Sequence, residues 1–220
     1  MEYRTLGSSG LQVSVVGLGT NNFGGRLDSK ATDAVIKRSV EQGINLLDTA
    51  NSYGDTRSEE FIGKSVKGIR DEVLLATKVA SPRGEGPNRR GASRKHVMEQ
   101  VELSLRRLQT DYIDLYWMHL WDRFTPIDET MRTLDDLVTA GKVRYIGFSD
   151  TPAWKVAQAQ VMATFRGWAP LVALQIEYSL VERTVEGELL PMANELGLGV
   201  TPWSPLKGGI LIDIRRLAGI

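Results

Sequence analysis

The sequence contains no cysteine and only two histidines among its 220 residues. The absence of cysteine excludes disulfide bonds, thiolate catalysis and cysteine-ligated zinc sites. Two histidines cannot build a dedicated zinc centre without carboxylate help, so we expect no metal site. No apolar run approaches the length of about eighteen residues that a membrane helix needs. The N-terminal residues lack the pattern of a secretory signal, and we expect a cytoplasmic chain without membrane contact.

An excess of either charge is also missing, because 27 Lys and Arg residues balance 27 Asp and Glu residues. No net field attracts nucleic acid, so we expect no nucleic-acid partner. The hydrophobic and charged fractions, 42% and 25%, are ordinary for a globular protein. A chain of this length can bury the core of one domain.

Short apolar runs divide the chain regularly. At the N-terminus, Tyr3 to Leu6 and Gln12 to Ser14 flank a turn-forming Gly-Ser-Ser-Gly cluster, which predicts a β-hairpin. Seven strand-like runs follow, alternating with amphipathic helical patterns. The strand ends are 26 to 41 residues apart, about one strand–helix–strand step, and are expected near Thr20, Asp48, Lys78, His119, Ser149, Glu177 and Trp203.

The predicted helices have recognisable start signals. Ser29 and Ser93 can cap two of them, and Pro126 and Pro152 suit the first turn of two others. His96 lies in a polar helical stretch, and we interpret it as exposed and without a functional role.

Near-continuous apolar strands covered by helices predict an α/β fold with a parallel sheet buried on both faces. Doubly wound sheets and barrels both fit, and the regular period favours a (β/α)8 barrel of the TIM type. Only six residues separate Trp203 from the apolar Ile210–Ile214 run, too few for a parallel crossover. That segment is therefore a hairpin, a helix start or a strand outside the barrel. We expect one barrel domain over residues 1–220, lacking the eighth strand and the final helices.

Four ionisable side chains fall at or just beyond three of these strand ends: Asp48, Tyr53, Lys78 and His119. Parallel strands bring their C-terminal ends to one edge, so a carboxylate, a phenol, an ammonium and an imidazole converge there. Each residue alone is more often structural, but their joint placement favours a site that delivers a proton. Trp121, just after His119, is a candidate for lining a substrate pocket, with simple packing as the alternative.

Several motifs occur in a fixed order and resemble the aldo-keto reductases, NADPH-dependent carbonyl reductases built on a (β/α)8 barrel. The resemblance extends from the hairpin to about Gly209 and rests on Gly17-Leu18-Gly19-Thr20, Asp48-Thr49-Ala50-x-x-Tyr53-Gly54, Thr77-Lys78, Tyr116-x-x-His119, Gly141-Lys142-Val143-Arg144-x-Ile146-Gly147-x-Ser149, Leu174-Gln175-x-x-Tyr178-Ser179 and Trp203-Ser204-Pro205-Leu206.

The resemblance implies four catalytic roles. Tyr53 would protonate the carbonyl oxygen of a small-molecule substrate, and Lys78 would be the cation that makes a phenol a better acid near neutral pH. Asp48 would hold Lys78 and offset the cost of burying its charge. His119 would hydrogen-bond the carbonyl oxygen and orient the substrate.

The resemblance also implies NADPH as cofactor, with NADH as the remaining alternative. The implied cofactor-binding residues are Gly19, Thr20, Asn21, Asp48, Ser149, Asp150, Gln175, Trp203, Ser204, Pro205 and Leu206. Many members of the family have asparagine at the position of Asp150. An ionised carboxylate can accept a hydrogen bond from the carboxamide of nicotinamide but cannot donate one to its oxygen. The basic clamp for the adenosine 2′-phosphate also lacks a convincing counterpart, and Arg215 and Arg216 are weak substitutes.

Two alternatives to an active reductase stay open. The fold could act as a binding or regulatory module that retains the nicotinamide pocket with negligible turnover. The chain could also be a shortened, catalytically impaired reductase, whose unpaired first and seventh strands would favour self-association. The natural substrate cannot be predicted from these residues.

Overall fold

A computed structural model of the chain describes residues 1–212. Its strands are β1 Tyr3–Thr5, β2 Gln12–Ser14, β3 Leu18–Gly19, β4 Leu46–Asp48, β5 Leu74–Val79, β6 Ile113–Met118, β7 Val143–Ser149, β8 Leu171–Glu177 and β9 Gly199–Trp203. Its α-helices are α1 Ser29–Glu41, α2 Arg57–Ser65, α3 Arg94–Leu108, α4 Ile127–Thr139, α5 Ala153–Arg166 and α6 Leu189–Glu195. Short 3-10 turns are η1 Arg70–Glu72, η2 Thr184–Glu186 and η3 Lys207–Gly209.

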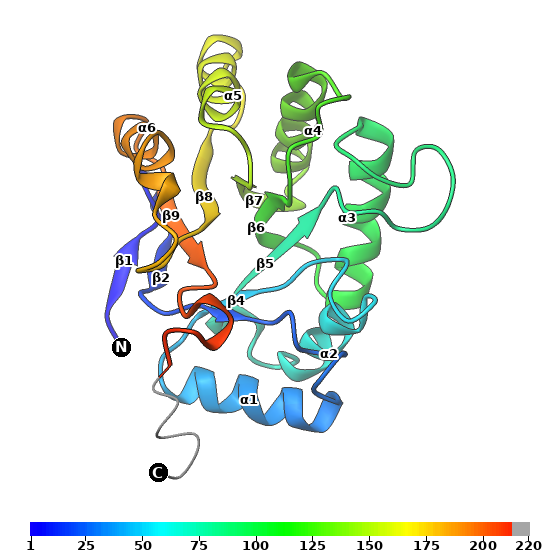
Figure 1. Ribbon diagram of the computed structural model, residues 1–220. Coiled ribbons are helices and arrows are strands. Elements are labelled where there is room, and N and C mark those ends of the chain that lie inside the picture. The colour runs from blue at the N-terminus through cyan, green and yellow to red at the C-terminus, as the bar shows by residue number, and fades with distance from the viewer. Residues whose placement is uncertain (213–220) are drawn as a thin grey trace.

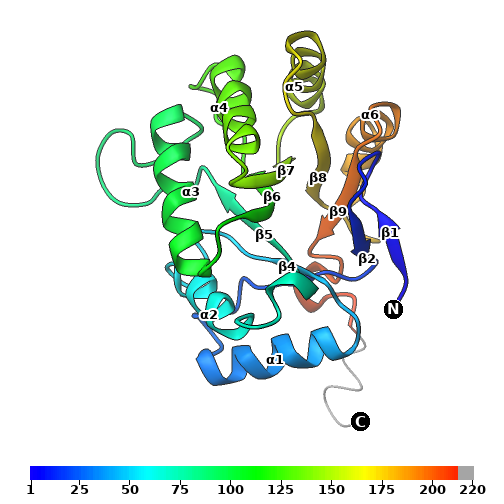
Figure 2. The same cartoon turned by 180° about the vertical axis from the view of Figure 1, so that it is seen from behind.

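Strands β3 to β9 form one parallel sheet whose spatial order is their order in the chain, and β1 pairs with β2 as an antiparallel hairpin. The sheet curls into a nearly closed barrel with the helices on its outside (Figures 1 and 2). The α/β barrel and the hairpin are thus confirmed, and each strand ends within one residue of its predicted end. Within residues 1–212, β3 and β9 are the two edges of this sheet.

The barrel has two apolar cores because alternate strand residues point to opposite faces. The larger core lies between the sheet and the helices. The smaller core fills the barrel interior with Leu46, Ala76, Leu115 and Ala173, and the hairpin residues Leu6 and Val13 belong to the same cluster. The residue two positions further along each strand points to the same side, so this apolar layer supports whatever lies at the C-terminal strand ends.

The helix starts agree with the sequence in three cases of four. The Ser93 hydroxyl accepts a hydrogen bond from the backbone N–H of His96, and Pro126 and Pro152 directly precede α4 and α5. The prediction for Ser29 was wrong. Asp28 caps α1 instead, since its side chain accepts from the N–H of Ala31 at 2.8 Å and Ser29 is already helical.

The prediction that His96 is exposed was also wrong, because its side chain is fully buried. His96 lies on α3 one turn before Gln100 and two turns before Ser104, and all three are buried. This face of α3 is polar and is nevertheless covered by the rest of the fold.

The chain leaves β9 through η3 and a turn that reaches Ile212. The described part of the Ile210–Ile214 run is therefore no strand, and Asp213 to Arg216 lie outside the described residues. Among the helices of residues 1–212, none combines the length and the apolar character needed to cross a membrane.

Candidate active site

The four ionisable residues singled out by the sequence meet at the C-terminal end of the barrel. Asp48 ends β4, Lys78 lies in β5, and His119 directly follows β6. Tyr53 lies in the loop between β4 and α2. Asp48 and Lys78 each stand two residues beyond a residue of the interior core, Leu46 and Ala76, so strand alternation brings both side chains into the barrel.

Asp48 and Lys78 form a buried ion pair with satisfied partners. The Lys78 side chain is fully buried and its Nζ donates to Asp48 Oδ1 and, at 2.8 Å, to the carbonyl oxygen of Thr49. Asp48 Oδ2 accepts from Trp117 Nε1 at 3.0 Å and from Gln175 Nε2 at 3.1 Å. A buried ion pair is stable only when further hydrogen bonds satisfy both ions, and this one meets that condition.

Trp117 holds its place because Gly147 faces it across the β6–β7 ladder. A Cβ atom at Gly147 would lie only 2.4 Å from the Trp117 ring, so no larger residue fits there. The indole is fully buried, and its single N–H donates to Asp48. Gly147 therefore contributes to the orientation of the ion pair without touching it.

Tyr53 lies beside both the ion pair and His119. The Lys78 nitrogen is 5.0 Å from the centre of the Tyr53 ring, and the Tyr53 and His119 rings meet edge to face with centres 5.7 Å apart. The turn after Tyr53 is strained, since Asp55 and Thr56 adopt positive φ of 53° and 74°. Arg83 Nη2 donates to Asp55 Oδ1 at 2.9 Å and helps to hold this turn.

His119 is partly buried and is a neutral imidazole near pH 7. Desolvation, followed by the neighbouring Lys78 cation, lowers the pKa of His119 from 6.5 to about 4. Its Nδ1 lies 3.1 Å from the Ser81 hydroxyl. A neutral ring in this position can hydrogen-bond a substrate without adding a second positive charge beside Lys78.

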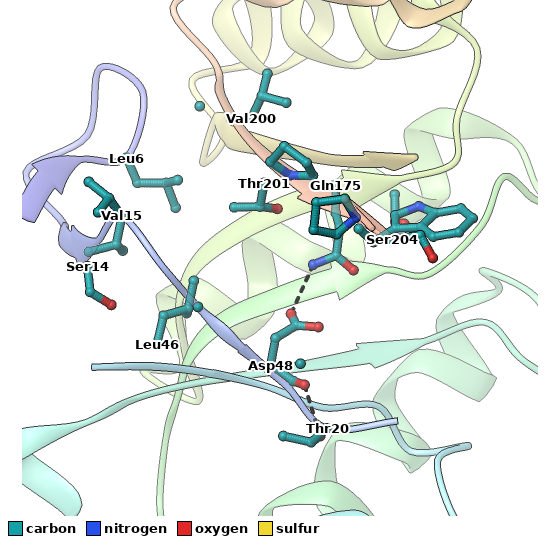
Figure 3. A pocket seen from close by; sticks show the side chains of 18 of the residues that line it. Leu6, Ser14, Val15, Thr20, Leu46, Asp48, Gln175, Val200, Thr201 and Ser204 are labelled. Carbon is teal, nitrogen blue, oxygen red and sulfur yellow. Dashed lines mark hydrogen bonds between the residues drawn. The ribbon is translucent and has the colours of Figure 1, made fainter. Parts of the chain in front are cut away.

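A cavity of about 690 Å³ lies over these residues and extends toward the gap between β3 and β9. Figure 3 shows Asp48 and Thr20 on one wall, Gln175, Thr201 and Ser204 on another, and the hairpin residues at one end. The predicted site residues that line it are Gly19, Thr20, Asn21, Asp48, Tyr53, His119, Ser149, Asp150, Gln175, Trp203, Ser204 and Pro205. Two predicted residues do not: Lys78 is buried behind Asp48, and Leu206 is an exposed residue outside the lining.

Asp150 and Trp203 are joined across the cavity rim, because Trp203 Nε1 donates to Asp150 Oδ1 at 3.1 Å. Asp150 follows β7 with a positive φ of 40°. Desolvation raises the pKa of Asp150, against the lowering effect of the Trp203 hydrogen bond. The carboxylate is thus held at the site in an unfavourable electrostatic setting.

The structure adds residues that the sequence reasoning did not assign. Trp117 and Ser81 contact Asp48 and His119 directly, and Ser58 bridges the hydroxyls of Thr20 and Thr49 at 3.0 and 2.8 Å. Strand alternation could have found Trp117, which lies in β6 two residues before His119. Trp121 does not line the large cavity and instead packs edge to face against Trp154.

The family profile described as "Aldo/keto reductase family" matches residues 15–216 of this chain. The matched range contains the four ionisable residues and all the predicted cofactor-binding residues, whereas the hairpin residues at one end of the cavity precede it.

Relatives are similar over almost the whole chain. An uncharacterized oxidoreductase of Bacillus subtilis, YrpG, is 46% identical over 96% of this chain and 68% of its own length. The aldo-keto reductase YhdN of the same organism is 42% identical, over 96% and 64%. A norsolorinic acid reductase of Emericella nidulans, stcV, is 41% identical, over 91% and 56%. The chain thus spans between about half and two thirds of the length of these proteins.

Proposed function

The chain belongs to the aldo/keto reductase family, and we propose that it reduces aldehydes or ketones to alcohols with NADPH, using Tyr53 as the general acid. The observation that carries the proposal is the satisfied Asp48–Lys78 pair beside Tyr53 and His119, at the wall of a cavity of about 690 Å³. A site that only bound a ligand would gain nothing from a buried ammonium beside a phenol, because the pair costs desolvation free energy.

The polar side chains that line the cavity suit the hydrogen-bonding groups of a nicotinamide cofactor. Within residues 1–212 the Ser149 hydroxyl and the Gln175 side-chain oxygen make no hydrogen bond, and both residues line the cavity. Trp203 offers a partly exposed aromatic face at the rim, 37% accessible. Ser149, Asp150 and Gln175 would hold the carboxamide, Trp203 would stack on the ring, and the Ser204–Leu206 turn would run beside the pyrophosphate.

When bound, NADPH supplies the hydride that reduces the carbonyl carbon. Tyr53 gives its phenolic proton to the carbonyl oxygen as negative charge develops there. Lys78 favours this transfer, because a nearby cation stabilises the phenolate that Tyr53 becomes. Asp48 and the Thr49 carbonyl fix the Lys78 ammonium, and His119 orients the carbonyl oxygen by a hydrogen bond. NADPH rather than NADH and a location in the cytoplasm remain part of this proposal.

Replacing Tyr53 by phenylalanine tests the proposal. We expect Tyr53→Phe to lose about a hundred- to ten-thousand-fold in kcat for aromatic and aliphatic aldehydes, the contribution of general acid catalysis. NADPH oxidation measures the rate, and fluorescence titration should give an unchanged NADPH affinity. Tyr3→Phe is the matched control, since Tyr3 lies on β1 and, within residues 1–212, its hydroxyl bonds only the Gly43 carbonyl. Equal rates in Tyr53→Phe and the parent would refute the role of Tyr53.

The alternative of a binding module predicts a different outcome. Tight NADPH retention with no oxidation across the whole carbonyl panel would favour it over reduction. The expected self-association through the edges β3 and β9 also stays a prediction, which the molar mass in solution would test.

A further inference from the structure

The chain makes an unusual turn where β5 ends. Ala80 has a positive φ of 100° and is 2% exposed, although alanine rarely adopts this conformation. Its carbonyl oxygen accepts from the Gly91 N–H at 2.8 Å, so the turn closes the loop that leads to α3. Such strain persists only where the surrounding structure maintains it, and it commonly marks a functional site. The residue that follows this turn is Ser81.

Ser81 has one contact that bears on the site. Its Oγ lies 3.1 Å from Nδ1 of His119, and within residues 1–212 this hydroxyl makes no other hydrogen bond. Two arrangements satisfy the distance. In one, Ser81 donates to a bare Nδ1 and the ring carries its proton on Nε2. In the other, Nδ1–H donates to Ser81, and the hydroxyl proton then lacks a partner among the described residues.

The first arrangement leaves fewer groups without a partner. Among residues 1–212, it leaves only Nε2–H unpaired, whereas the second leaves both the hydroxyl proton and Nε2 unpaired. A hydroxyl carries one proton, and the bond to Nδ1 uses it. The Nε2 atom of His119 has no hydrogen bond within residues 1–212, while His119 lines the large cavity. A carbonyl oxygen can only accept a hydrogen bond, so a bare Nε2 would repel it and an Nε2–H would bind it.

We propose that Ser81 is a positioning residue that donates its hydroxyl proton to His119 Nδ1 and thereby keeps the ring in the Nε2–H tautomer. The consequence for catalysis, a donor aimed at the carbonyl oxygen of the substrate, rests on the proposed function. The fixed tautomer itself does not. The choice matters because His119, with a pKa of about 4, is neutral near pH 7, and only a neutral ring has two tautomers.

Nitrogen NMR of the imidazole rings tests the tautomer without any substrate. The chain has only two histidines, so the two-bond proton–nitrogen spectrum contains two ring patterns, and His119→Gln identifies the one from His119. In the parent protein near pH 7, we expect Nε2 to show the shift of a protonated nitrogen and Nδ1 that of a bare one. A protonated Nδ1 would overturn the proposal, and this measurement needs no Ser81 variant.

Two variants then isolate the hydroxyl. Ser81→Ala should bring the two nitrogen shifts of His119 closer together, since both tautomers become populated, and Ser81→Thr should restore the parent pattern. Unchanged shifts in a folded Ser81→Ala would overturn the proposal. Turnover should follow the same order, with kcat/KM about fivefold lower in Ser81→Ala, close to the parent value in Ser81→Thr, and NADPH affinity equal in all three.

The two readouts separate the two proposals. If the parent shows the Nε2–H tautomer and Ser81→Ala loses it, the positioning role stands even where no carbonyl is reduced, and only the proposed function fails. If turnover is present and Ser81→Ala keeps the full kcat/KM despite the altered spectrum, the orienting role toward the substrate is overturned.

Discussion

The two sides of the barrel mouth are built differently. On the ion-pair side, formed by Asp48, Lys78 and Trp117, strands β5 and β6 are buried almost throughout and the charged groups have protein partners. On the open side, formed by Asp150, Trp203 and Ser204, strand β9 is only partly buried and ends at the edge of the described sheet. The first side is complete without a ligand, whereas the second presents exposed aromatic surface and polar groups.

This difference indicates which property a substitution on each side should change. The folding free energy offsets the desolvation of the buried Asp48–Lys78 pair, so substitutions there should lower both stability and turnover. Side chains on the open side make few buried contacts with the core, so substitutions there should change cofactor affinity but not the unfolding free energy.

The largest effect is expected from Lys78→Met, which breaks the ion-pair side. It leaves the Asp48 carboxylate buried without its cation, which should cost about 3–5 kcal/mol of unfolding free energy, and turnover should fall at least as far as in Tyr53→Phe. Urea denaturation and NADPH oxidation measure the two effects. Lys37→Met is the control, because Lys37 forms an exposed pair with Asp33 and should lose no more than about 1 kcal/mol.

A second substitution separates stability from catalysis. Asp48→Asn combined with Lys78→Met removes both charges, so much of the lost stability should return while turnover stays low. If Lys78→Met is as stable as Lys37→Met, the two sides of the mouth do not differ as described.

The sequence predicts the barrel well because its strands are buried on both faces. Such strands appear as apolar runs with a polar residue at the end, and Asp48, Ser149 and Glu177 mark three of these ends. The site follows from the same rule, since parallel strands place their C-terminal ends at one edge. Asp48, Lys78 and His119 therefore converge as expected.

Tertiary contacts decide what the sequence does not predict. Asp28 and Ser29 are both good helix caps, and only the extended backbone of Asp28 selects between them. The polar stripe with His96 on α3 resembles a solvated face, but Gln100 reaches Asn51 of the β4–α2 loop at 3.0 Å. Ser81 becomes a partner of His119 through the positive φ of Ala80, a conformation that an alanine in the sequence does not signal.

The next largest effect should appear in the pH dependence of stability at His119. Its pKa is about 4 in the folded protein and 6.5 ordinarily, so between these values the unfolded chain binds more protons. His119 therefore costs stability as the pH falls from 6.5, and the full cost is present below 4. The upper bound is about 3 kcal/mol. Urea denaturation across this range should show the parent losing unfolding free energy relative to His119→Gln as the pH falls. The contributions of the other titrating groups cancel in this difference.

A constant difference between these two proteins from above pH 6.5 to below pH 4 would contradict the lowered pKa of His119. It would also weaken the contrast between the two sides, because desolvation and the nearby Lys78 are its causes.

The smallest effect is expected on the open side, from Asp150→Asn. Asparagine keeps an oxygen for the Trp203 N–H, tolerates the positive φ of 40° better than most residues, and adds an amide donor. It also removes a negative charge from the lining of the cavity that is proposed to hold the anionic cofactor. NADPH affinity by fluorescence titration should rise about threefold to fivefold, with little change in unfolding free energy. Asp111→Asn, at an exposed turn before β6, is the control.

The pH dependence of NADPH affinity sharpens this last test. On acidification the Asp150 carboxylate takes up a proton, and the NADPH affinity of the parent should rise. Because the pKa of Asp150 is raised, this rise should occur at a higher pH than it would for an ordinary Asp. Asp150→Asn should lack this part of the pH dependence. Weaker NADPH binding in Asp150→Asn would mean that the charged carboxylate holds the cofactor better than an amide does, and the open side would then be as specifically built as the ion-pair side.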